Sequence, residues 1–418
     1  MPIFLYNFFI LIYKLGIRLA SFKSNKAKAW IVGRRDLLEK IALWRNGLAA
    51  DEKIIWIHCA SLGEFEQGRP LIEKLKEANN DTKIVLTFFS PSGYEIRKNY
   101  TGVDAVFYLP MDGKKNAEKF IEILQPTFVF WVKYEYWFYY LITLKQKGIP
   151  VILISAIFRR SQPFFKWYGG MWKKILHSFD KIFVQNKESL TLLQTIGLAQ
   201  NANVMGDTRF DRVIDIAEKI TMLPVSLQHF VSNSQVIVAG STWEEDEIEL
   251  VHYANANPHI KFIIAPHEID DERIADVKKL FKNSVLFSTI KEQTAAQIII
   301  IDNIGMLATL YKLATVVYIG GGFNDTGIHN ILEAAVFGKP IIFGPVYEKF
   351  SEAVNLVNEG GAFSITNAIE LEERLNTFLS NEMLLTKTGE ICRKFVYSNR
   401  GASNKILQYV YENRLLTN

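Results

Sequence analysis

The sequence predicts an α/β protein made of two Rossmann-like domains that face each other across a cleft. Short β-branched and aromatic runs alternate with longer amphipathic stretches along 418 residues, which is typical of parallel strands joined by crossover helices. This length is sufficient for two domains of ordinary size. Apolar residues make up 49% of the chain and aromatic residues 13%, so we expect large cores and exclude a disordered chain.

The expected strands fall into two series, with a break at residues 206–233. The first series comprises Ile54–Cys59, Ile84–Phe88, Ala105–Leu109, Thr127–Val132, Val151–Ser155 and Lys181–Gln185. The second comprises Gln235–Gly240, Lys261–Ala265, Gln297–Ile301, Thr315–Ile319 and Pro340–Phe343. Ligands of open α/β sheets bind beyond the carboxyl ends of the strands, so the loops after these runs are the candidate sites.

Charge is distributed unevenly along the chain. The net charge is only +4, but residues 1–48 carry nine Lys or Arg against Asp36 and Glu39. A nucleic-acid-binding surface would not be confined to one end in this way, whereas a membrane-surface anchor would be. We therefore expect a membrane partner and no nucleic acid.

The first thirteen residues are nearly all apolar and are followed by Lys14. About 20 apolar residues are needed to span a bilayer, so this run is short by itself. Basic residues follow the apolar run instead of preceding it, which is unlike a secretory signal. We expect an inner-leaflet anchor that spans the bilayer or lies in its interface, with the basic run on the cytoplasmic side. A first helix buried in the core is the alternative.

Cysteine and histidine usage favours a protein without metal. The two cysteines, Cys59 and Cys392, argue against a disulfide scaffold and fit a reducing compartment. The seven histidines are scattered, and no Cys/His cluster has zinc-ligand spacing. We predict neither a metal site nor a bound cofactor.

A glycine turn, Gly320–Gly322, follows the expected strand Thr315–Ile319, and His329–Glu333 comes soon after it. Glycines let backbone approach a ligand closely, and the start of the next helix can hold ribose and phosphate. This order favours a nucleotide-sugar donor site and hence glycosyl transfer; a tight connection is the alternative. Ser241 and Thr242, followed by four acidic residues, predict a second, capped helix start that binds an anion.

Three charged side chains outside this segment are candidates for chemistry. Glu64 follows the first strand, where a carboxylate can take a proton from an attacking hydroxyl; a helix-dipole role is the alternative. Glu135 follows the strand Thr127–Val132 among many aromatics, where a salt bridge to Lys133 or Arg69 is the alternative. Arg209, at the domain junction, can neutralise a phosphate or carboxylate, or pair with Asp207 as a structural hinge.

Taken in order, four segments resemble the Kdo transferase family, which adds 3-deoxy-D-manno-oct-2-ulosonic acid (Kdo) to the lipid A precursor. The segments are Ser61–Glu64, Glu135–Trp137, Gly206–Asp211 and Gly321–Glu333, in the family's order and approximate spacing. The resemblance extends from the N-terminal anchor to about residue 400. The ordered set is specific, whereas any one member alone is not.

The resemblance implies the two-domain GT-B fold and an inverting, metal-independent transfer of Kdo from CMP-Kdo to lipid IVA at the cytoplasmic face of the inner membrane. Glu64 would be the general base, and Glu135 and Arg209 would stabilise the transition state. CMP would be held by Pro266, His267, Gly305, Met306, Leu307, Asn330, Ile331, Leu332 and Glu333. Domain closure would bring Glu64 to the donor.

The chain departs from the family pattern at three positions. His267 stands where the family often has arginine, Arg209 where lysine is common, and Phe138 where proline usually follows the tryptophan. The first change weakens a phosphate contact or leaves it to another group, and the second keeps the charge but alters its geometry. None of the three removes the proposed base.

The predicted organisation has five parts. Residues 1–22 form the anchor, 23–210 the acceptor-binding domain, 211–233 the linker, 234–395 the CMP-Kdo-binding domain, and 396–418 a C-terminal helix that packs back on the first domain. The alternatives in function are a GT-B transferase with a UDP- or GDP-sugar donor and a non-catalytic, membrane-associated sugar-nucleotide-binding protein. A dehydrogenase is disfavoured because no G-x-G-x-x-G follows the first strand of either half.

Overall fold

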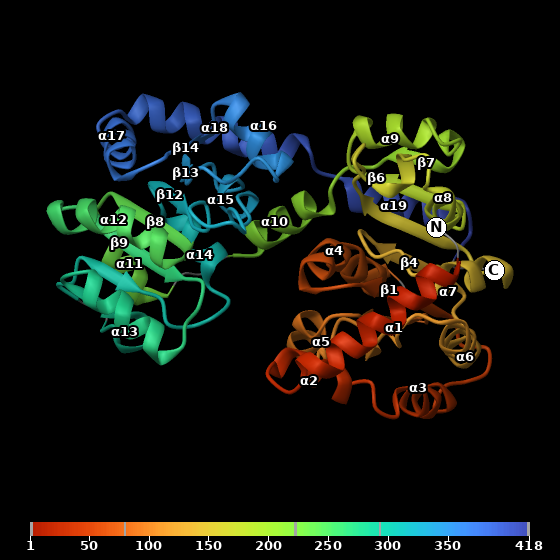
Figure 1. The fold of residues 1–418 in the computed structure, drawn as a ribbon. Helices are drawn as coiled ribbons and strands as arrows, with labels where there is room; N and C mark the ends of the chain where they lie inside the picture. The colour runs from red at the N-terminus through yellow and green to blue at the C-terminus, as the bar shows by residue number, and fades with distance from the viewer. Residues whose placement is uncertain (1–2, 79–80, 221–223, 292–293, 416–418) are drawn as a thin grey trace. The chain divides into compact units, whose positions relative to one another are not determined.

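The computed structural model describes residues 3–78, 81–220, 224–291 and 294–415. Residues 1–2 of the expected anchor and 221–223 of the expected linker therefore lie outside the described residues. The chain divides into two compact units: unit 1 is Met1–Arg212 with Arg400–Asn418, and unit 2 is Val213–Asn399. Each unit is built around one parallel sheet with helices on both faces (Figure 1).

The sheet of unit 1 has seven parallel strands in the order β3-β2-β1-β4-β5-β6-β7. These strands are β1 Ile54–Cys59, β2 Lys83–Phe88, β3 Ala105–Tyr108, β4 Phe128–Val132, β5 Val151–Ala156, β6 Lys181–Val184 and β7 Ala202–Val204. Its helices are α1 Ile3–Ala20, α2 Asn25–Val32, α3 Leu37–Asn46, α4 Leu62–Ala78, α5 Pro91–Arg97, α6 Lys114–Leu124, α7 Phe138–Gln146, α8 Gly170–Leu176, α9 Lys187–Gln194 and α19 Ala402–Glu412. The helix α10 Thr208–Lys219 begins in unit 1 and ends in unit 2.

Both faces of the unit 1 sheet are buried under helices. Because side chains alternate along a strand, each strand contributes to two cores. In β1, Ile54 and Trp56 join a core shared with α1, α3, α6 and α7, whereas Ile55 and Ile57 join a core shared with α4 and α19. This explains why the strands read as unbroken apolar runs instead of alternating patterns. The last helix, α19, contributes Ile406 to this second core.

The sheet of unit 2 also has seven parallel strands, in the order β10-β11-β9-β8-β12-β13-β14. These strands are β8 Val236–Thr242, β9 Lys261–Pro266, β10 Ser284–Leu286, β11 Ile298–Ile300, β12 Val316–Ile319, β13 Ile341–Phe343 and β14 Ala362–Ser364. Its helices are α11 Val225–Val231, α12 Glu244–Ala256, α13 Asp271–Leu280, α14 Leu307–Leu313, α15 Leu332–Ala335, α16 Ser351–Glu359, α17 Ala368–Leu379 and α18 Glu382–Ser398. The expected α/β class with two parallel sheets is thus confirmed.

Helix α1 packs one side against unit 1 and leaves the other exposed. Tyr6 and Ile10 are buried in the unit 1 core, and the Tyr6 hydroxyl donates a 2.5 Å hydrogen bond to Asp112. Phe4 and Leu19, in contrast, are 76% and 70% exposed. By length and composition α1 is able to cross a membrane, but these contacts place it along the surface of unit 1.

Candidate functional site

Each sheet has a switch point. It lies between two adjacent strands after which the chain continues toward opposite edges of the sheet. In unit 1 it lies between β1 and β4, and in unit 2 it lies between β8 and β12. In open α/β sheets, ligands bind at the carboxyl ends of the strands at such a point. The sequence places Glu64 after β1, Glu135 after β4 and the glycine turn after β12, so all three follow switch-point strands.

Glu64 lies in the first turn of α4. It is partly exposed, and the Ser61 hydroxyl donates a hydrogen bond to its Oε2. Burial raises the pKa of the Tyr134 hydroxyl, beyond β4, and the charge of Arg159 opposes this shift. Two of the predicted residues, Glu64 on α4 and Arg209 on α10, both belong to unit 1.

Glu135 is held by aromatic and histidine side chains. Trp137 Nε1 donates a 2.8 Å hydrogen bond to Oε2 of Glu135, and His58 Nε2 lies 3.5 Å from the same oxygen. His58 is fully buried in β1, and its Nδ1 lies 2.9 Å from the Thr87 hydroxyl. The Glu135 side chain, 26% exposed, is therefore oriented by Trp137, with His58 of β1 beside it, and can still reach solvent.

Arg209 is paired with its neighbour Asp207. Its Nε and Nη2 donate to Oδ2 of Asp207 at 2.9 and 2.7 Å, and its backbone N–H donates to Oδ1 at 2.9 Å. Burial by itself raises the pKa of the Asp207 carboxyl, but the charges of Arg209 and Lys133 outweigh it and hold the pKa below its usual value. The hinge pairing expected as an alternative is present, and 21% of the Arg209 side chain stays exposed.

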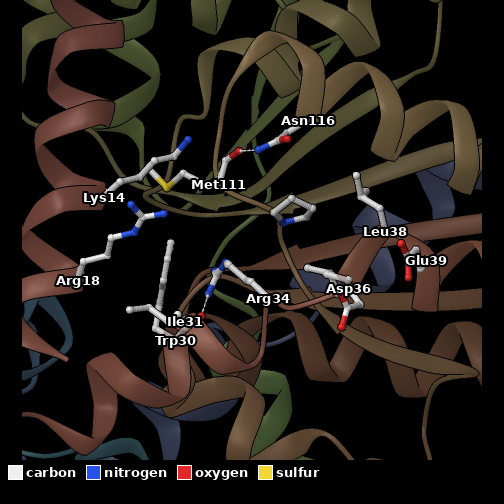
Figure 2. A pocket seen from close by; sticks show the side chains of 12 residues that line it. Lys14, Arg18, Trp30, Ile31, Arg34, Asp36, Leu38, Glu39, Met111 and Asn116 are labelled. Carbon is white, nitrogen blue, oxygen red and sulfur yellow. Dashed lines mark hydrogen bonds between the residues drawn. The ribbon is translucent and has the colours of Figure 1, made fainter. Parts of the chain in front are cut away.

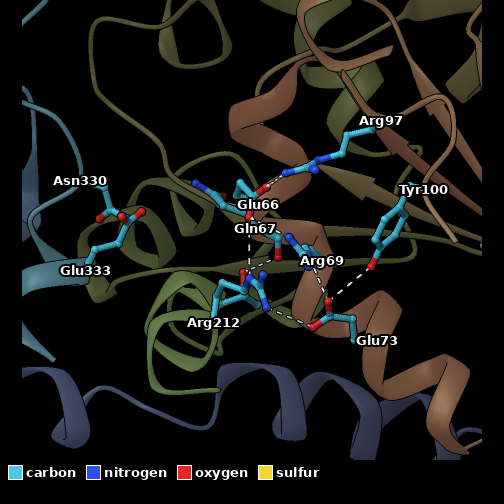
Figure 3. Close-up of polar contacts among 10 residues, drawn as sticks. Glu66, Gln67, Arg69, Glu73, Arg97, Tyr100, Arg212, Asn330 and Glu333 are labelled. Atoms are coloured by element: carbon cyan, nitrogen blue, oxygen red, sulfur yellow. Dashed lines mark hydrogen bonds and ion pairs between the residues drawn. The ribbon is translucent and has the colours of Figure 1, made fainter. Parts of the chain in front are cut away.

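A network of ion pairs fixes α4, the helix that carries Glu64 (Figure 3). Arg212 Nη1 lies 3.3 Å from Glu73, and Arg69 Nε donates to Glu73 at 2.8 Å. Arg97 Nη2 donates to Glu66 at 3.1 Å. Arg69, one of the two partners considered for Glu135, is thus engaged on α4. The base candidate therefore sits on a braced helix, which limits its positional freedom.

In unit 2, five of the residues predicted to hold CMP line one pocket of about 160 Å³. They come from two loops, after β9 and after β11: Pro266, His267, Gly305, Met306 and Leu307. Gly305 has a φ of +98°, which a residue with a side chain rarely adopts, so glycine is required for this turn.

An aromatic stack joins this pocket to the glycine segment. The ring of His267 lies 4.6 Å from that of Trp243 and 4.5 Å from that of His329, stacked in both cases. Trp243 Nε1 donates to His329 Nε2 at 3.3 Å. Burial, with a contribution from His267, lowers the pKa of His329 to about 4, and burial also lowers the pKa of His267. His267 therefore offers hydrogen bonds at neutral pH but does not supply a full positive charge.

The glycine turn is required by close backbone packing. A Cβ on Gly320 would lie 2.3 Å from the Ser241 carbonyl oxygen, and Gly321 has a φ of +90°. The Gly321 N–H donates to the Asp246 carboxylate at 2.7 Å, and the Trp243 N–H donates to the same group at 2.9 Å. The Asp246 carboxylate thus takes up two backbone N–H groups next to the start of α12, and the anion site expected there stays a prediction.

The segment Asn330–Glu333 is placed differently from the pocket residues. Asn330 bonds within the segment, donating to Glu333 at 3.1 Å and accepting from the Leu332 N–H at 3.2 Å. Ile331 and Leu332 are buried in the core, so only their backbone groups are available to a ligand. These four residues do not line the pocket beside His267. Their role in CMP binding stays a prediction.

The sequence pointed to Glu64, Glu135 and Arg209 but not to the side chains that position them. Trp137 donates to Glu135, and His58, whose Nδ1 lies 2.9 Å from the Thr87 hydroxyl, lies beside the same carboxylate. No local signal singles out His58 or Thr87, because both lie within apolar strands and their contacts depend on how the strands pair. Within the described ranges, no three His, Cys, Asp or Glu side chains form a metal-binding cluster.

Comparison with known proteins identifies relatives over most of the chain. A family model described as 3-deoxy-D-manno-octulosonic-acid transferase (kdotransferase) matches residues 35–212. The protein named 3-deoxy-D-manno-octulosonic acid transferase from Rickettsia felis is 30% identical over 380 residues, or 85% of this chain and 78% of that protein. Its namesake from Aquifex aeolicus is 29% identical over 337 residues, or 78% of this chain and 86% of that one.

Solved structures with low sequence identity share the two-domain fold. UDP-GlcNAc 2-epimerase from Neisseria meningitidis has a TM-score of 0.62 at 17% identity and covers 86% of this chain and all of its own. MurG from Acinetobacter baumannii has a TM-score of 0.53 at 13% identity, with coverage of 86% and 99%. These likenesses confirm the GT-B fold class. The 30% identity with the Rickettsia felis protein over most of both chains shows that the chain belongs to the 3-deoxy-D-manno-octulosonic acid transferase family of glycosyltransferases.

Proposed function

We propose that this protein transfers Kdo from CMP-Kdo to a sugar hydroxyl of the lipid A precursor, lipid IVA, with inversion at the anomeric carbon. Family membership supports Kdo transfer. The observation that carries the mechanism is Glu64, a partly exposed carboxylate at the switch point of unit 1, on a helix braced by ion pairs. Such a group can act as a general base toward an acceptor hydroxyl.

In this mechanism Glu64 takes the acceptor's proton as the hydroxyl oxygen attacks the anomeric carbon from the face opposite CMP. The bond from that carbon to the CMP phosphate breaks, and the electron pair leaves with CMP. Inversion follows from this single displacement. Glu135 and Arg209 would stabilise the transition state, because oriented polar groups act most strongly where charge develops.

The donor would be held by unit 2. Its pocket is lined by Pro266, His267 and Gly305–Leu307, with the backbone of Asn330–Glu333 as a further candidate. His267 is largely neutral at pH 7, because burial lowers its pKa. It would donate a hydrogen bond to the phosphate.

We further propose that α1 binds the inner membrane from its cytoplasmic face and lies in the interface instead of spanning the bilayer. The buried Tyr6 and Ile10 tie the first half of α1 to unit 1. Its outward side chains, among them Phe4 and Leu19, are exposed and apolar. A helix of this kind inserts one face between lipid headgroups.

The general-base assignment is tested with Glu64→Gln. We expect Kdo transfer to lipid IVA to fall by about 10²–10⁴-fold in kcat, because a positioned base contributes that much, while CMP binding is unchanged. The matched control is Glu77→Gln, an exposed glutamate on the same helix, which should keep wild-type rates. Near wild-type transfer by Glu64→Gln would show that the base is another group.

The donor is tested by competition. Calorimetric titration with CMP, UDP and GDP should show the tightest binding for CMP. His267→Ala should weaken CMP binding, whereas the exposed His252→Ala, on α12, should not. Preference for UDP or GDP would favour the alternative of a different nucleotide-sugar donor.

A further inference from the structure

A second pocket lies in unit 1, beside the apolar helix α1. It has a volume of about 450 Å³ and is lined by α1, the end of α2, the start of α3 and the segment after β3. This volume falls in the ordinary range of small-molecule sites. It is nearly three times that of the pocket beside His267.

Three cations line this pocket: Lys14 and Arg18 from α1, and Arg34 from the turn after α2. Figure 2 shows Lys14 and Arg18 extending from one side, whereas Asp36 and Glu39 lie on the opposite side. Among the described residues, no carboxylate lies within ion-pair distance of any of these three cations. The basic side of the pocket therefore carries uncompensated positive charge.

Arg34 is the most constrained of the three. Its Nε donates to the Leu109 carbonyl at 2.9 Å, its Nη2 to that of Phe89 at 2.7 Å, and its Nη1 to that of Trp30 at 3.1 Å. Its Cζ lies 3.8 Å from the centre of the Trp30 ring. These partners are neutral, so they fix the guanidinium without neutralising it. Holding a half-buried cation in this way is costly unless an anion offsets it.

The acidic side has groups suited to hydroxyls. Asp36 has a left-handed φ of 53° and, although it precedes α3, its side chain makes no capping hydrogen bond. Glu39 lies one turn further along α3. Both carboxylates are exposed and line the pocket, so they can accept hydrogen bonds from a sugar ring whose phosphate faces the cations.

The pocket is linked to Glu135 through aromatic rings. The guanidinium of Arg34 lies 4.8 Å from the centre of the Phe89 ring, and Phe89 lies 4.5 Å from Trp137. Trp137 in turn donates to the Glu135 carboxylate. A ligand held at Arg34 would therefore be connected to Glu135 through two aromatic rings, Phe89 and Trp137.

We propose that this pocket binds a terminal phosphate of a membrane-embedded glycolipid, with the phosphate at Lys14, Arg18 and Arg34 and the sugar toward Asp36 and Glu39. A phosphomonoester carries nearly two negative charges at pH 7 and accepts several hydrogen bonds. The lipid source is favoured over free phosphate because α1, which forms the basic wall, turns its exposed apolar face outward. The inference rests on the proposed lipid acceptor and assigns its phosphate subsite.

The experiment compares two kinds of vesicle with the full-length protein. Phosphatidylcholine vesicles carry equal mole fractions of either phosphatidic acid, a monoester, or phosphatidylglycerol, a diester. Wild type should bind the monoester vesicles more tightly. In the Lys14→Gln/Arg18→Gln variant, the affinity for monoester vesicles should fall about tenfold or more, so that the preference is lost. The variant should still bind diester vesicles through α1. Arg34→Gln should do the same, and circular dichroism should show that each variant is folded.

Controls remove cations that do not line the pocket. Arg35→Gln, next to Arg34, and Lys23→Gln, just after α1, should keep the wild-type preference. Equal binding of the two vesicle types by wild type, or a preserved preference in the Lys14/Arg18 variant, would overturn the proposal. Displacement of monoester vesicles by an equal concentration of inorganic phosphate would overturn the lipid source.

An assay of Kdo transfer distinguishes a failure of the proposed subsite from a failure of the proposed function. If wild type transfers Kdo and the Lys14/Arg18 variant shows an unchanged KM for the lipid acceptor, the subsite is wrong and the function stands. If wild type transfers nothing but binds monoester vesicles through the pocket, the function is wrong and the subsite stands. We expect an acceptor KM raised about tenfold or more, with the KM for CMP-Kdo unchanged.

Discussion

Thr87 in β2 pairs with two buried ring nitrogens of β1 at once. Its hydroxyl oxygen lies 2.8 Å from Trp56 Nε1 and 2.9 Å from His58 Nδ1. All three side chains are fully buried. This one hydroxyl therefore pairs with a ring nitrogen of His58, which faces Glu135, and with the ring nitrogen of Trp56.

Thr87→Val tests this role because valine has nearly the same shape without the hydroxyl. We expect the free energy of unfolding to fall by about 1–3 kcal/mol, since Trp56 and His58 lose a shared partner in the core. Urea denaturation measures this change. Thr87→Ser, which keeps the hydroxyl, should lose less, and equal losses in the two variants would attribute the effect to packing.

His329 predicts how the stability of unit 2 depends on pH. Its pKa in the folded protein, about 4, lies below the ordinary histidine value of 6.5, so between these values the unfolded chain binds more protons than the folded one. Stability therefore decreases as the pH falls through this window. The loss contributed by His329 between pH 8 and pH 5 is about 2 kcal/mol.

Denaturation of the wild type and of His329→Gln at both pH values measures this contribution. The difference in unfolding free energy between pH 8 and pH 5 should be smaller in the variant. An identical pH dependence in the two proteins would show that His329 titrates normally in the folded state.

Charged residues that follow strand ends were predictable as site candidates, because their side chains can carry out chemistry. Glu64 and Arg209 are charged side chains that follow strands of unit 1, and the structure places both in the first turn of a helix, α4 and α10. His58 was not assigned a role, because a histidine inside an apolar strand reads as core. Its contact with Glu135 depends on β1 and β4 being neighbours, and only the three-dimensional pairing of strands provides this information.

At the scale of elements, α1 behaves as a surface helix with two different sides. Its inner side is fixed to unit 1 by Tyr6, Ile10 and Tyr13, whose ring lies 6.1 Å from Phe89. Its outer side carries large apolar groups in contact with solvent. Membrane binding therefore needs no refolding of α1.

Phe4→Ser/Leu19→Ser tests the outer side of α1. Vesicle co-sedimentation should show affinity weakened by about tenfold or more, because each large apolar side chain contributes about 1.5–3 kcal/mol when transferred from water. The midpoint of thermal unfolding should be unchanged, since both residues are exposed. Ile369→Ser, equally exposed on α17 of unit 2, is the control, and a similar loss there would contradict an α1-specific surface.

The long strands were predictable from sequence, and the short edge strands were not. β1 has the expected bounds, and β5 differs by one residue. In contrast, β7, β10 and β14 have three residues each and lie at or next to the edge of a sheet. Most of their side chains are not buried, so no apolar run marks them, whereas β11 and β13 are equally short but fully buried and were predictable.

At the scale of the whole molecule, the two units are not consecutive in the chain. The chain leaves unit 1 after Arg212 and returns to it at Arg400. The Asp211 carboxylate accepts hydrogen bonds from the backbone N–H groups of Gly401 and Ser403 at 2.5 and 2.7 Å, which fixes the returning segment. Beyond it, α19 places Ile406 in the core of unit 1.

Ile406→Ala should therefore destabilise unit 1 and spare unit 2. Removing a fully buried isoleucine costs about 2–5 kcal/mol. Hydrogen exchange read by mass spectrometry should show faster exchange in β1 and β6, with β8 and β9 unchanged. Leu375→Ala, equally buried on α17 of unit 2, should give the reverse pattern. Faster exchange of β8 in the Ile406 variant would contradict this assignment.

The return of the chain to unit 1 also has a consequence for biosynthesis. Unit 2 is one uninterrupted segment, Val213–Asn399, so all of it has been translated before α19 leaves the ribosome. Unit 1 is translated first, but it needs residues that are translated only after the whole of unit 2. During synthesis, unit 2 is thus free to finish folding while the core of unit 1 still lacks Ile406, and the N-terminal half of the protein becomes complete last.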